Sequence, residues 1–227
     1  QGSEVLAEEK GSPLPVVSRD FNLGQFKGPI QFTVWKEMLP ALRPSPCHVT
    51  LDPATNHPNL VLSRDLESVR LEDNPEEEVP DGPERFSKSV CVLGAQGFTS
   101  GRHYWEVEVG DKTSWDIGVA AESVNRKEAK VKVKPSHGFW AIWLRNGSEY
   151  KALDSPSKQL SLKIRPQKVG VYLDYEGGQV SFYDADTMAH IYTFSEVFLE
   201  RLYPMFSPGV NKDGLNAEPL RLVSPRA

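Results

Sequence analysis

Cysteine and the residues of metal centres are scarce in this chain of 227 residues. It holds two cysteines, Cys47 and Cys91, and its five histidines show no metal-ligand spacing. Such a set cannot build the paired zinc centres of a RING or B-box domain. A domain of this size does not need a disulfide, so both thiols are typical of buried or idle cysteines in a reducing compartment. A disulfide or a reactive thiol is the alternative.

Long apolar runs and excess positive charge are also missing. No stretch approaches the roughly 20 apolar residues that span a bilayer, and residues 1–10 lack the basic and apolar regions of a signal peptide. The formal net charge of −5 attracts neither nucleic acid nor an anionic membrane. We therefore expect an intracellular protein, cytoplasmic or nuclear, with no membrane insertion and no nucleic-acid partner.

Catalytic signatures are absent as well. The sequence contains no Gly-x-Ser-x-Gly elbow, phosphate loop or dinucleotide fingerprint. Glu106 and Glu108 stand two apart, which places their Cα atoms about 6.5 Å apart on one strand face. Such a pair could cleave glycosides, but a polar outer face of a sheet, with arginine or lysine as partners, is the favoured interpretation. We predict no catalytic residues, no metal and no cofactor in this chain, and keep a carbohydrate-binding or carbohydrate-cleaving sandwich as an alternative.

Aromatic and branched residues, by contrast, are well represented and alternate along the chain. Within Ser100–Ala120 the residues that share one face are His103, Trp105, Val107 and Val109, followed after a short turn by Trp115, Ile117 and Val119. Tyr104, Glu106 and Glu108 take the other face. This alternation predicts two strands of a half-buried antiparallel sheet around the turn.

Short strand candidates separated by turn residues continue through most of the chain. They are Leu60–Leu62, Ser89–Leu93, Tyr104–Val109, Trp115–Ala120, Phe139–Leu144, Glu149–Leu153, Val169–Tyr175, Val180–Asp184, Ile191–Phe194 and Leu220–Val223. Many strands at short spacing predict an all-β sandwich or barrel.

The N-terminal part differs from the rest. Residues 1 to about 27 are polar and typical of a linker. Gly28-Pro29 then opens a short helical pattern that Pro40 ends, and its apolar positions are Val34, Trp35, Met38 and Leu39. This helix either docks on the domain or ends a longer helical element upstream. A scaffold role, in which it mediates self-association, is a further alternative.

Asn146-Gly147 is the strongest hairpin signal in the sequence. It predicts that Arg145 pairs with Ser148 and Trp143 with Tyr150. Trp143 and Arg145 then lie on the less apolar face of their strand, beside Tyr150. Such a cluster is typical of a binding hot spot, where Arg145 would pair with a carboxylate or a carbonyl. An ordinary cross-strand aromatic pair beside a snorkelling arginine is the alternative.

Two charged stretches remain. Residues 72–81 are acidic and interrupted by prolines, as in a solvated loop. In residues 126–134 lysines alternate with small apolar residues. That pattern favours an edge strand blunted by lysine, and a contact patch for an acidic or phosphorylated partner is the alternative.

Several motifs in one order resemble the PRY–SPRY domain that ends many tripartite-motif ubiquitin ligases, butyrophilins and pyrin. They are Leu51-Asp52-Pro53, His57-Pro58-Asn59-Leu60, Pro83-Glu84-Arg85-Phe86, Val92-Leu93-Gly94, Phe98 to Val107, Trp115 to Val119, Leu173 to Gly178 and Phe206-Ser207-Pro208-Gly209. Residues 24–42 resemble the linker that follows the coiled coil in tripartite-motif proteins. We therefore expect residues 1–46 to be linker with a short helical segment, 47–97 a PRY segment and 98–227 a SPRY domain.

The resemblance implies a bent, concanavalin-like antiparallel β-sandwich of two sheets, without catalytic residues, that recognises a protein or peptide substrate. Carried over by position, the family's partner site falls on Glu122, Trp143, Arg145, Val210 and Asn211. Some relatives have a second tryptophan where Arg145 stands and an aromatic residue where Val210 stands, which argues against their partners, such as an antibody Fc. The parent protein would be a RING-type E3 ubiquitin ligase, with zinc in upstream RING and B-box domains and a coiled coil that makes it a dimer.

Overall fold

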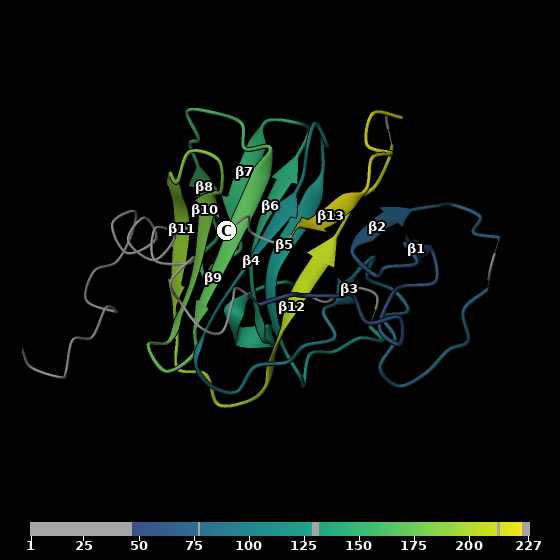
Figure 1. Cartoon of the computed structure of the whole chain (residues 1–227), viewed down its shortest axis with the longest axis horizontal. Helices are drawn as coiled ribbons and strands as arrows, with labels where there is room; N and C mark the ends of the chain where they lie inside the picture. The colour runs from purple at the N-terminus through teal and green to yellow at the C-terminus, as the bar shows by residue number, and fades with distance from the viewer. Residues whose placement is uncertain (1–46, 77, 129–131, 213, 224–227) are drawn as a thin grey trace, which may run out of the picture.

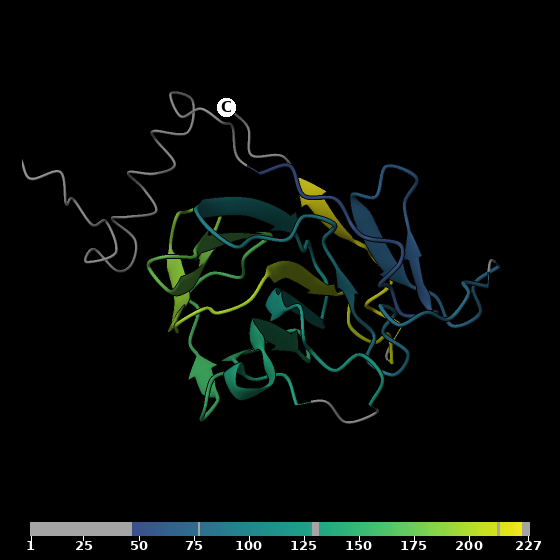
Figure 2. The same cartoon turned by 90° about the horizontal axis from the view of Figure 1, so that it is seen from below.

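The computed structural model describes residues 47–76, 78–128, 132–212 and 214–223, which form two antiparallel sheets packed face to face. Figures 1 and 2 show the sheets as the two layers of a bent sandwich, with β1 and β2 extending to one side. The prediction of an all-β sandwich is confirmed. The N-terminal linker and its helical segment fall outside the described residues. No helix within these ranges is long and apolar enough to cross a membrane.

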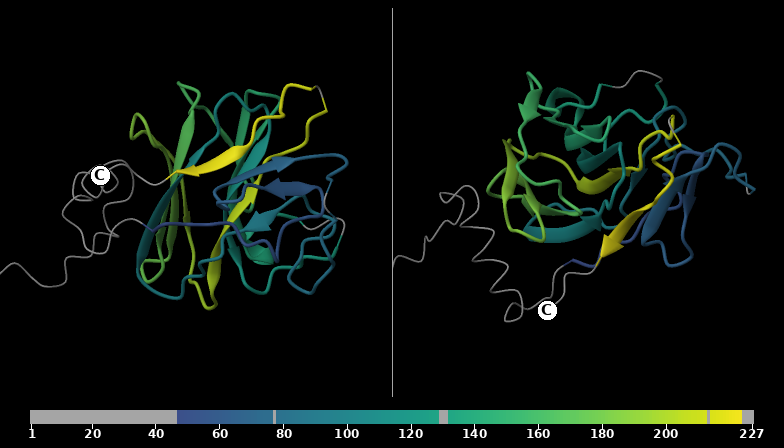
Figure 3. Two further views of the ribbon diagram at one scale, coloured as in Figure 1. Left: turned by 45° about the vertical axis from the view of Figure 1, so that its right-hand side comes forward. Right: turned by 90° about the horizontal axis from the view of Figure 1, so that it is seen from above.

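The larger sheet has seven strands in the order β1-β2-β13-β4-β9-β10-β11. These strands are β1 (Leu60–Leu62), β2 (Ser68–Leu71), β4 (Arg102–Glu108), β9 (Lys168–Asp174), β10 (Gln179–Asp184), β11 (His190–Ser195) and β13 (Leu220–Val223). In Figure 3, β13 lies across the sandwich between β2 and β4, so the last strand of the chain joins the first two to the main body.

The second sheet has six strands in the order β3-β12-β5-β6-β7-β8. Its strands are β3 (Val92–Leu93), β5 (Trp115–Ala121), β6 (Phe139–Arg145), β7 (Glu149–Ala152), β8 (Lys158–Leu160) and β12 (Leu202–Ser207). A short 3-10 helix, η3 (Pro135–His137), precedes β6. Neighbouring strands β5, β6 and β7 follow one another in sequence, whereas β12 is inserted between β3 and β5 from far along the chain.

The two strands within Ser100–Ala120 are present as β4 and β5, but they belong to different sheets. Trp105 and Trp115 are each 1 % exposed and lie in the same core cluster. The alternation was therefore read correctly, while the implied pairing of the two strands was wrong. The intervening turn crosses from one layer to the other, and Gly110 N donates to Gln167 O at 3.0 Å on the way. The apolar faces of two successive strands can pack against each other from opposite sheets, and they need not belong to neighbouring strands of one sheet.

The outer face of β4 differs from the expected polar surface. Tyr104, Tyr172 and Tyr183 form a second buried cluster there. The Tyr104 hydroxyl donates to Glu106 Oε1 at 2.8 Å, and Lys168 Nζ lies 3.4 Å from Glu106 Oε2. Because Glu106 is only 3 % exposed, it does not form an open pair of carboxylates with the next glutamate along the strand. The glycoside-cleaving alternative therefore loses its site.

Strand β12 escaped the sequence analysis because it contains Pro204, and proline is rare in central strands. The structure accommodates Pro204 because its nitrogen, which carries no hydrogen to donate, points away from β5. Pro204 O accepts from Gly94 N at 2.8 Å, and the nitrogen of a strand residue points to the same side as its carbonyl. That side faces β3, which ends at Leu93. The proline therefore costs β12 no hydrogen bond to β5.

We expect the fold to lose stability as the pH falls below about 6.5, the ordinary histidine value. Burial lowers the pKa of His57 and of His190. His57 Nδ1 accepts from Asn59 N at 3.1 Å, a bond that protonation there would break. A base whose pKa is lower in the folded state is protonated more readily when unfolded, so acid favours unfolding, by about 1.4 kcal/mol per unit of lowering.

Urea midpoints at pH 7.5 and 5.5 measure this loss. The double variant His57→Gln, His190→Gln should show a smaller difference in stability between the two pH values. An unchanged difference in the double variant would contradict the role given to the two histidines.

Candidate functional site

The outer face of the six-stranded sheet carries a hollow of about 320 Å³, which we call the outer groove. Strand β6 shows which face this is: Ile142 and Leu144 point into the core, and the alternate positions Phe139 and Arg145 line the groove. Among the described residues its lining is made by Phe86, Ser89, Val90, Cys91, Ser114, Asp116, Val133, Phe139, Arg145, Met205, Ser207, Gly209 and Val210. The strands therefore supply the floor, and separate loops supply the walls.

Arg145 is held rigidly at one side of the groove. Its Nη1 lies 2.6 Å from Asp116 Oδ1 and donates to the carbonyls of Leu144 and Trp115 at 2.8 and 3.1 Å. The guanidinium carbon sits 4.3 Å from the centre of the Trp143 ring, in a cation–π contact. The structure thus brings Trp143 and Arg145 together on the outer face, as the strand pattern predicted.

Tyr150 does not join them, because the predicted hairpin register was wrong by one residue. Asn146 and Gly147 both have positive φ, and Ser148 N donates to Arg145 O at 3.3 Å, so the tight turn is present. Ser148, however, stays outside the ladder, and the pairs are Arg145 with Glu149, Leu144 with Tyr150 and Trp143 with Lys151. A shift of one residue moves a side chain to the other face.

Tyr150 consequently points into the core. It is 6 % exposed and contacts the Trp115 ring edge-on at 6.2 Å between centroids. Burial also raises the pKa of its phenol. We therefore leave Tyr150 out of the outer groove.

Val210 also lines the outer groove, on the loop after β12, and it is 44 % exposed. The loop turns at Gly209, where φ is +73° and an added Cβ would lie 2.4 Å from Ser114 O. Only glycine fits this close approach. Asn211, the next predicted site residue, is exposed, and its Oδ1 accepts from Asn216 N at 2.8 Å. The structure therefore places Val210 in the groove and gives Asn211 a role in closing the loop.

Asn216 fixes this loop to the turn before β5, and sequence reasoning missed it. Its Nδ2 donates to the carbonyls of Ser114, Pro208 and Val210 at 2.9–3.0 Å. Its Oδ1 accepts from Thr113 N and from Ser114 N. Because these partners lie up to 103 residues away, no local pattern marks the residue.

Lys112 adds a second attachment for the same loop. Its Nζ donates to Asn216 O at 3.2 Å and to Glu218 O at 2.6 Å. The side chain is 1 % exposed, and burial lowers its pKa to about 8. The loop that carries Val210 is therefore tied down at both ends rather than free.

Glu122, the remaining predicted residue, lies away from the others. It follows the end of β5, whereas Asp116 stands near the start, directly opposite Trp143. Six residues of strand span about 20 Å. The Glu122 carboxylate accepts from the Tyr203 hydroxyl at 3.2 Å. The structure thus groups Trp143, Arg145 and Val210, and leaves Glu122 at the far end of the sheet.

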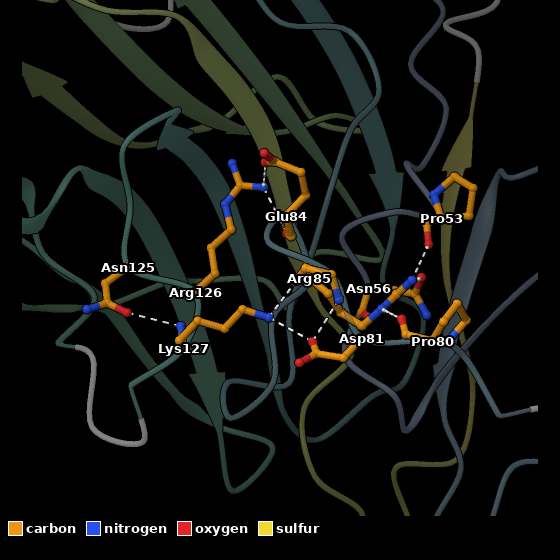
Figure 4. Close-up of polar contacts among 10 residues, drawn as sticks. Pro53, Asn56, Pro80, Asp81, Glu84, Arg85, Asn125, Arg126 and Lys127 are labelled. Carbon is orange, nitrogen blue, oxygen red and sulfur yellow. Dashed lines mark hydrogen bonds and ion pairs between the residues drawn. The ribbon is translucent and has the colours of Figure 1, made fainter.

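The segment that brings Phe86 to the groove is held by a polar network shown in Figure 4. Arg126 Nη1 lies 2.7 Å from Glu84 Oε2 and donates to Glu84 O at 2.9 Å. Lys127 Nζ reaches Asp81 Oδ1 at 2.8 Å. These contacts join the loop after β5 to the segment that carries Phe86, whose ring lies 5.7 Å from the Arg126 guanidinium carbon.

The network continues through Arg85, which is 5 % exposed. Its guanidinium donates to Pro80 O at 2.7 Å, to Pro53 O at 3.2 Å and to both oxygens of Asn56 at 2.7 and 3.1 Å. In Figure 4 these acceptors surround the arginine head from several loops. Arg85 thus organises the segment that leads into the groove wall.

The groove has the chemistry of a binding site. Its one thiol, Cys91, is 6 % exposed, and burial raises the thiol pKa far above its usual range. A protonated thiol is a poor nucleophile. Apolar side chains with one fixed arginine at the edge suit the capture of an apolar group that has a polar neighbour.

Comparison with known proteins identifies the family to which the chain belongs. Residues 102–219 match the SPRY domain family, and residues 49–98 match the SPRY-associated domain, PRY. The chain therefore belongs to the PRY–SPRY family, and the sequence resemblance is confirmed.

The similar curated proteins are longer than this chain. Nuclear factor 7, brain, from Xenopus laevis is 57 % identical over 208 residues, covering 92 % of this chain and 34 % of that protein. The E3 ubiquitin-protein ligase TRIM69 from Mus musculus is 53 % identical over 214 residues, covering 94 % of this chain and 42 % of that protein. This chain thus spans well under half of each relative.

Solved structures share the architecture. The stonustoxin structure superposes with a TM-score of 0.67 and 28 % identity, over 78 % of this chain and 29 % of that one. The crystal structure of the TRIM65 PSpry domain gives a TM-score of 0.64 and 24 % identity, over 78 % of this chain and 90 % of that one. The second likeness supports the sandwich fold alone.

Proposed function

We propose that this chain is a protein-recognition module that binds a partner protein at the outer groove. The observation that carries the proposal is the groove itself: an apolar hollow framed by loops from four separate parts of the chain, with Arg145 fixed on Trp143 at its edge. Interface hot spots have this composition, with an aromatic and an arginine beside a pocket that excludes water.

We further propose that the parent protein is a RING-type ubiquitin ligase for which this domain selects substrates. The support is the identity with TRIM69, which is named as an E3 ubiquitin-protein ligase. Zinc in upstream RING and B-box domains, dimer formation through a coiled coil, and a cytoplasmic or nuclear location belong to the same proposal.

Substituting Val210 with aspartate tests the groove. Val210 is 44 % exposed, so we expect a change in unfolding free energy within about 0.5 kcal/mol. A charge in the apolar wall should lower partner capture at least about tenfold, because an unpaired carboxylate would be desolvated on binding. The measurement is affinity capture from cell extract with quantitative mass spectrometry.

Leu199→Asp serves as the matched control. Leu199 is 89 % exposed and lies outside the groove, so its substitution should leave capture unchanged. Trp143→Ala is a second groove variant that removes the surface on which Arg145 stacks. Equal capture by wild type, Val210→Asp and Trp143→Ala would refute the assignment of the groove.

A further inference from the structure

The guanidinium of Arg145 is only partly used by the fold. Its three polar contacts within the described chain are all made by Nη1: to Asp116 Oδ1 and to the carbonyls of Leu144 and Trp115. The edge formed by Nε and Nη2 makes none. Arginine binds carboxylates through two parallel N–H donors of such an edge. Because stacking on Trp143 and the Nη1 contacts fix the group, a ligand would find this edge already oriented.

Three of the chain segments that line the groove are basic, although the whole chain has a net charge of −5. Arg145 and Asp116 neutralise each other within the groove. The bordering segments 88–91, 132–134 and 207–212 contain no aspartate or glutamate, and their lysines are Lys88, Lys132, Lys134 and Lys212. None of these lysines forms an ion pair within the described chain. Such a local field attracts a negatively charged segment.

The floor of the groove is apolar and therefore suits an apolar group of the same ligand. Phe139 and Met205 are each 2 % exposed and underlie a volume of about 320 Å³. That volume exceeds what one large side chain occupies, and Arg145 lines the same hollow. An apolar residue seated on the floor therefore brings its immediate neighbour in sequence within reach of the guanidinium.

Resting on the proposed function, we infer that the outer groove recognises an acidic segment of a partner protein, in which an aliphatic or aromatic residue stands next to an aspartate or glutamate. The apolar side chain fills the groove, the neighbouring carboxylate accepts from Nε and Nη2 of Arg145, and further carboxylates face the surrounding lysines. The basic stretch at 126–134 thereby acquires a role through residues 132–134.

Two synthetic peptides of equal shape test this inference. Acetyl-Gly-Asp-Leu-Asp-Asp-Gly-amide and its counterpart with three asparagines differ only in charge. Titration of the ¹⁵N-labelled chain should show the acidic peptide binding at least about tenfold more tightly, with shifts at Arg145 Nε–H and the Trp143 indole N–H. Added salt should weaken the binding of the acidic peptide and leave the binding of the asparagine peptide unaffected. Equal binding of the two peptides, or binding of neither, would overturn the inference.

Arg145→Gln should remove most of the preference for the acidic peptide, and the matched variant Arg64→Gln, on an exposed turn outside the groove, should retain it. A third peptide with phosphoserine at the central acidic position examines a phosphate source; binding of that peptide alone would reject a carboxylate ligand. Protein capture that survives Arg145→Gln but is lost in Val210→Asp would reject the acidic ligand while leaving the groove as the docking site.

Discussion

Replacing Asn216 with leucine should lower the free energy of unfolding by about 3 to 5 kcal/mol and abolish partner binding at the outer groove. Asn216 is 3 % exposed, and its side chain forms five hydrogen bonds with backbone groups. Leucine has a similar volume but would leave these donors and acceptors without partners. Such orphaned buried groups cost more than the hydrogen bonds themselves contribute.

The loss of binding follows from the position of Val210, whose carbonyl is one of the acceptors. Without Asn216 the loop no longer has a fixed place against Ser114. Urea denaturation measures the stability, and peptide titration of the folded fraction measures the binding. Asn74→Leu, at an exposed asparagine, provides the control and should change stability by less than about 0.5 kcal/mol. A loss below about 1 kcal/mol in Asn216→Leu would show that the network is not cooperative.

Replacing Arg85 with leucine should destabilise the fold by a comparable amount, about 3 to 5 kcal/mol. Its guanidinium holds acceptors from Pro53, Asn56 and Pro80 together in a buried position. Lysine would not substitute, because a single ammonium lacks the fixed fork of donors that reaches all of them. Arg85→Lys should therefore recover less than half of the lost stability.

Arg70→Leu is the matched control for Arg85. Its side chain is 44 % exposed and pairs with Glu72 at 2.9 Å, so its removal should cost no more than about 1 kcal/mol. Thermal and urea unfolding of the three variants provide the comparison. Equal losses in Arg70→Leu and Arg85→Leu would contradict the role given to the buried network.

Alternation within strands was readable from the sequence because it is a local property. The core faces of β4 and β5 follow from the apolar residues at every second position, and the core face of β6 follows from its alternate set of Trp140, Ile142 and Leu144, which is wholly apolar. Their partners were less readable: β4 and β5 belong to different sheets, and Pro204 concealed β12. Pairing depends on the path of the connecting loops, which alternation does not encode.

The positions of the candidate site residues were predictable to the same extent. Trp143 and Arg145 were placed correctly on the outer face of β6 because strand phase indicates that face. Tyr150 was misplaced because the single residue Ser148 remains outside the hairpin ladder. Asn216 and Lys112 gave no signal, since contacts across more than 100 residues define both. The lining of the groove therefore emerged only once distant loops were placed side by side.

The division of the groove into strand floor and loop walls has a consequence for how such domains diversify. Met205 and Phe139 are each 2 % exposed in the core, whereas the side chains of Val210 and Val133 stand on loops and are more exposed. Substitution of an exposed wall side chain costs little stability as long as the contacts that anchor its loop are kept. Under the proposed function, a few substitutions of wall side chains would therefore give copies of this domain new targets while the scaffold stays constant.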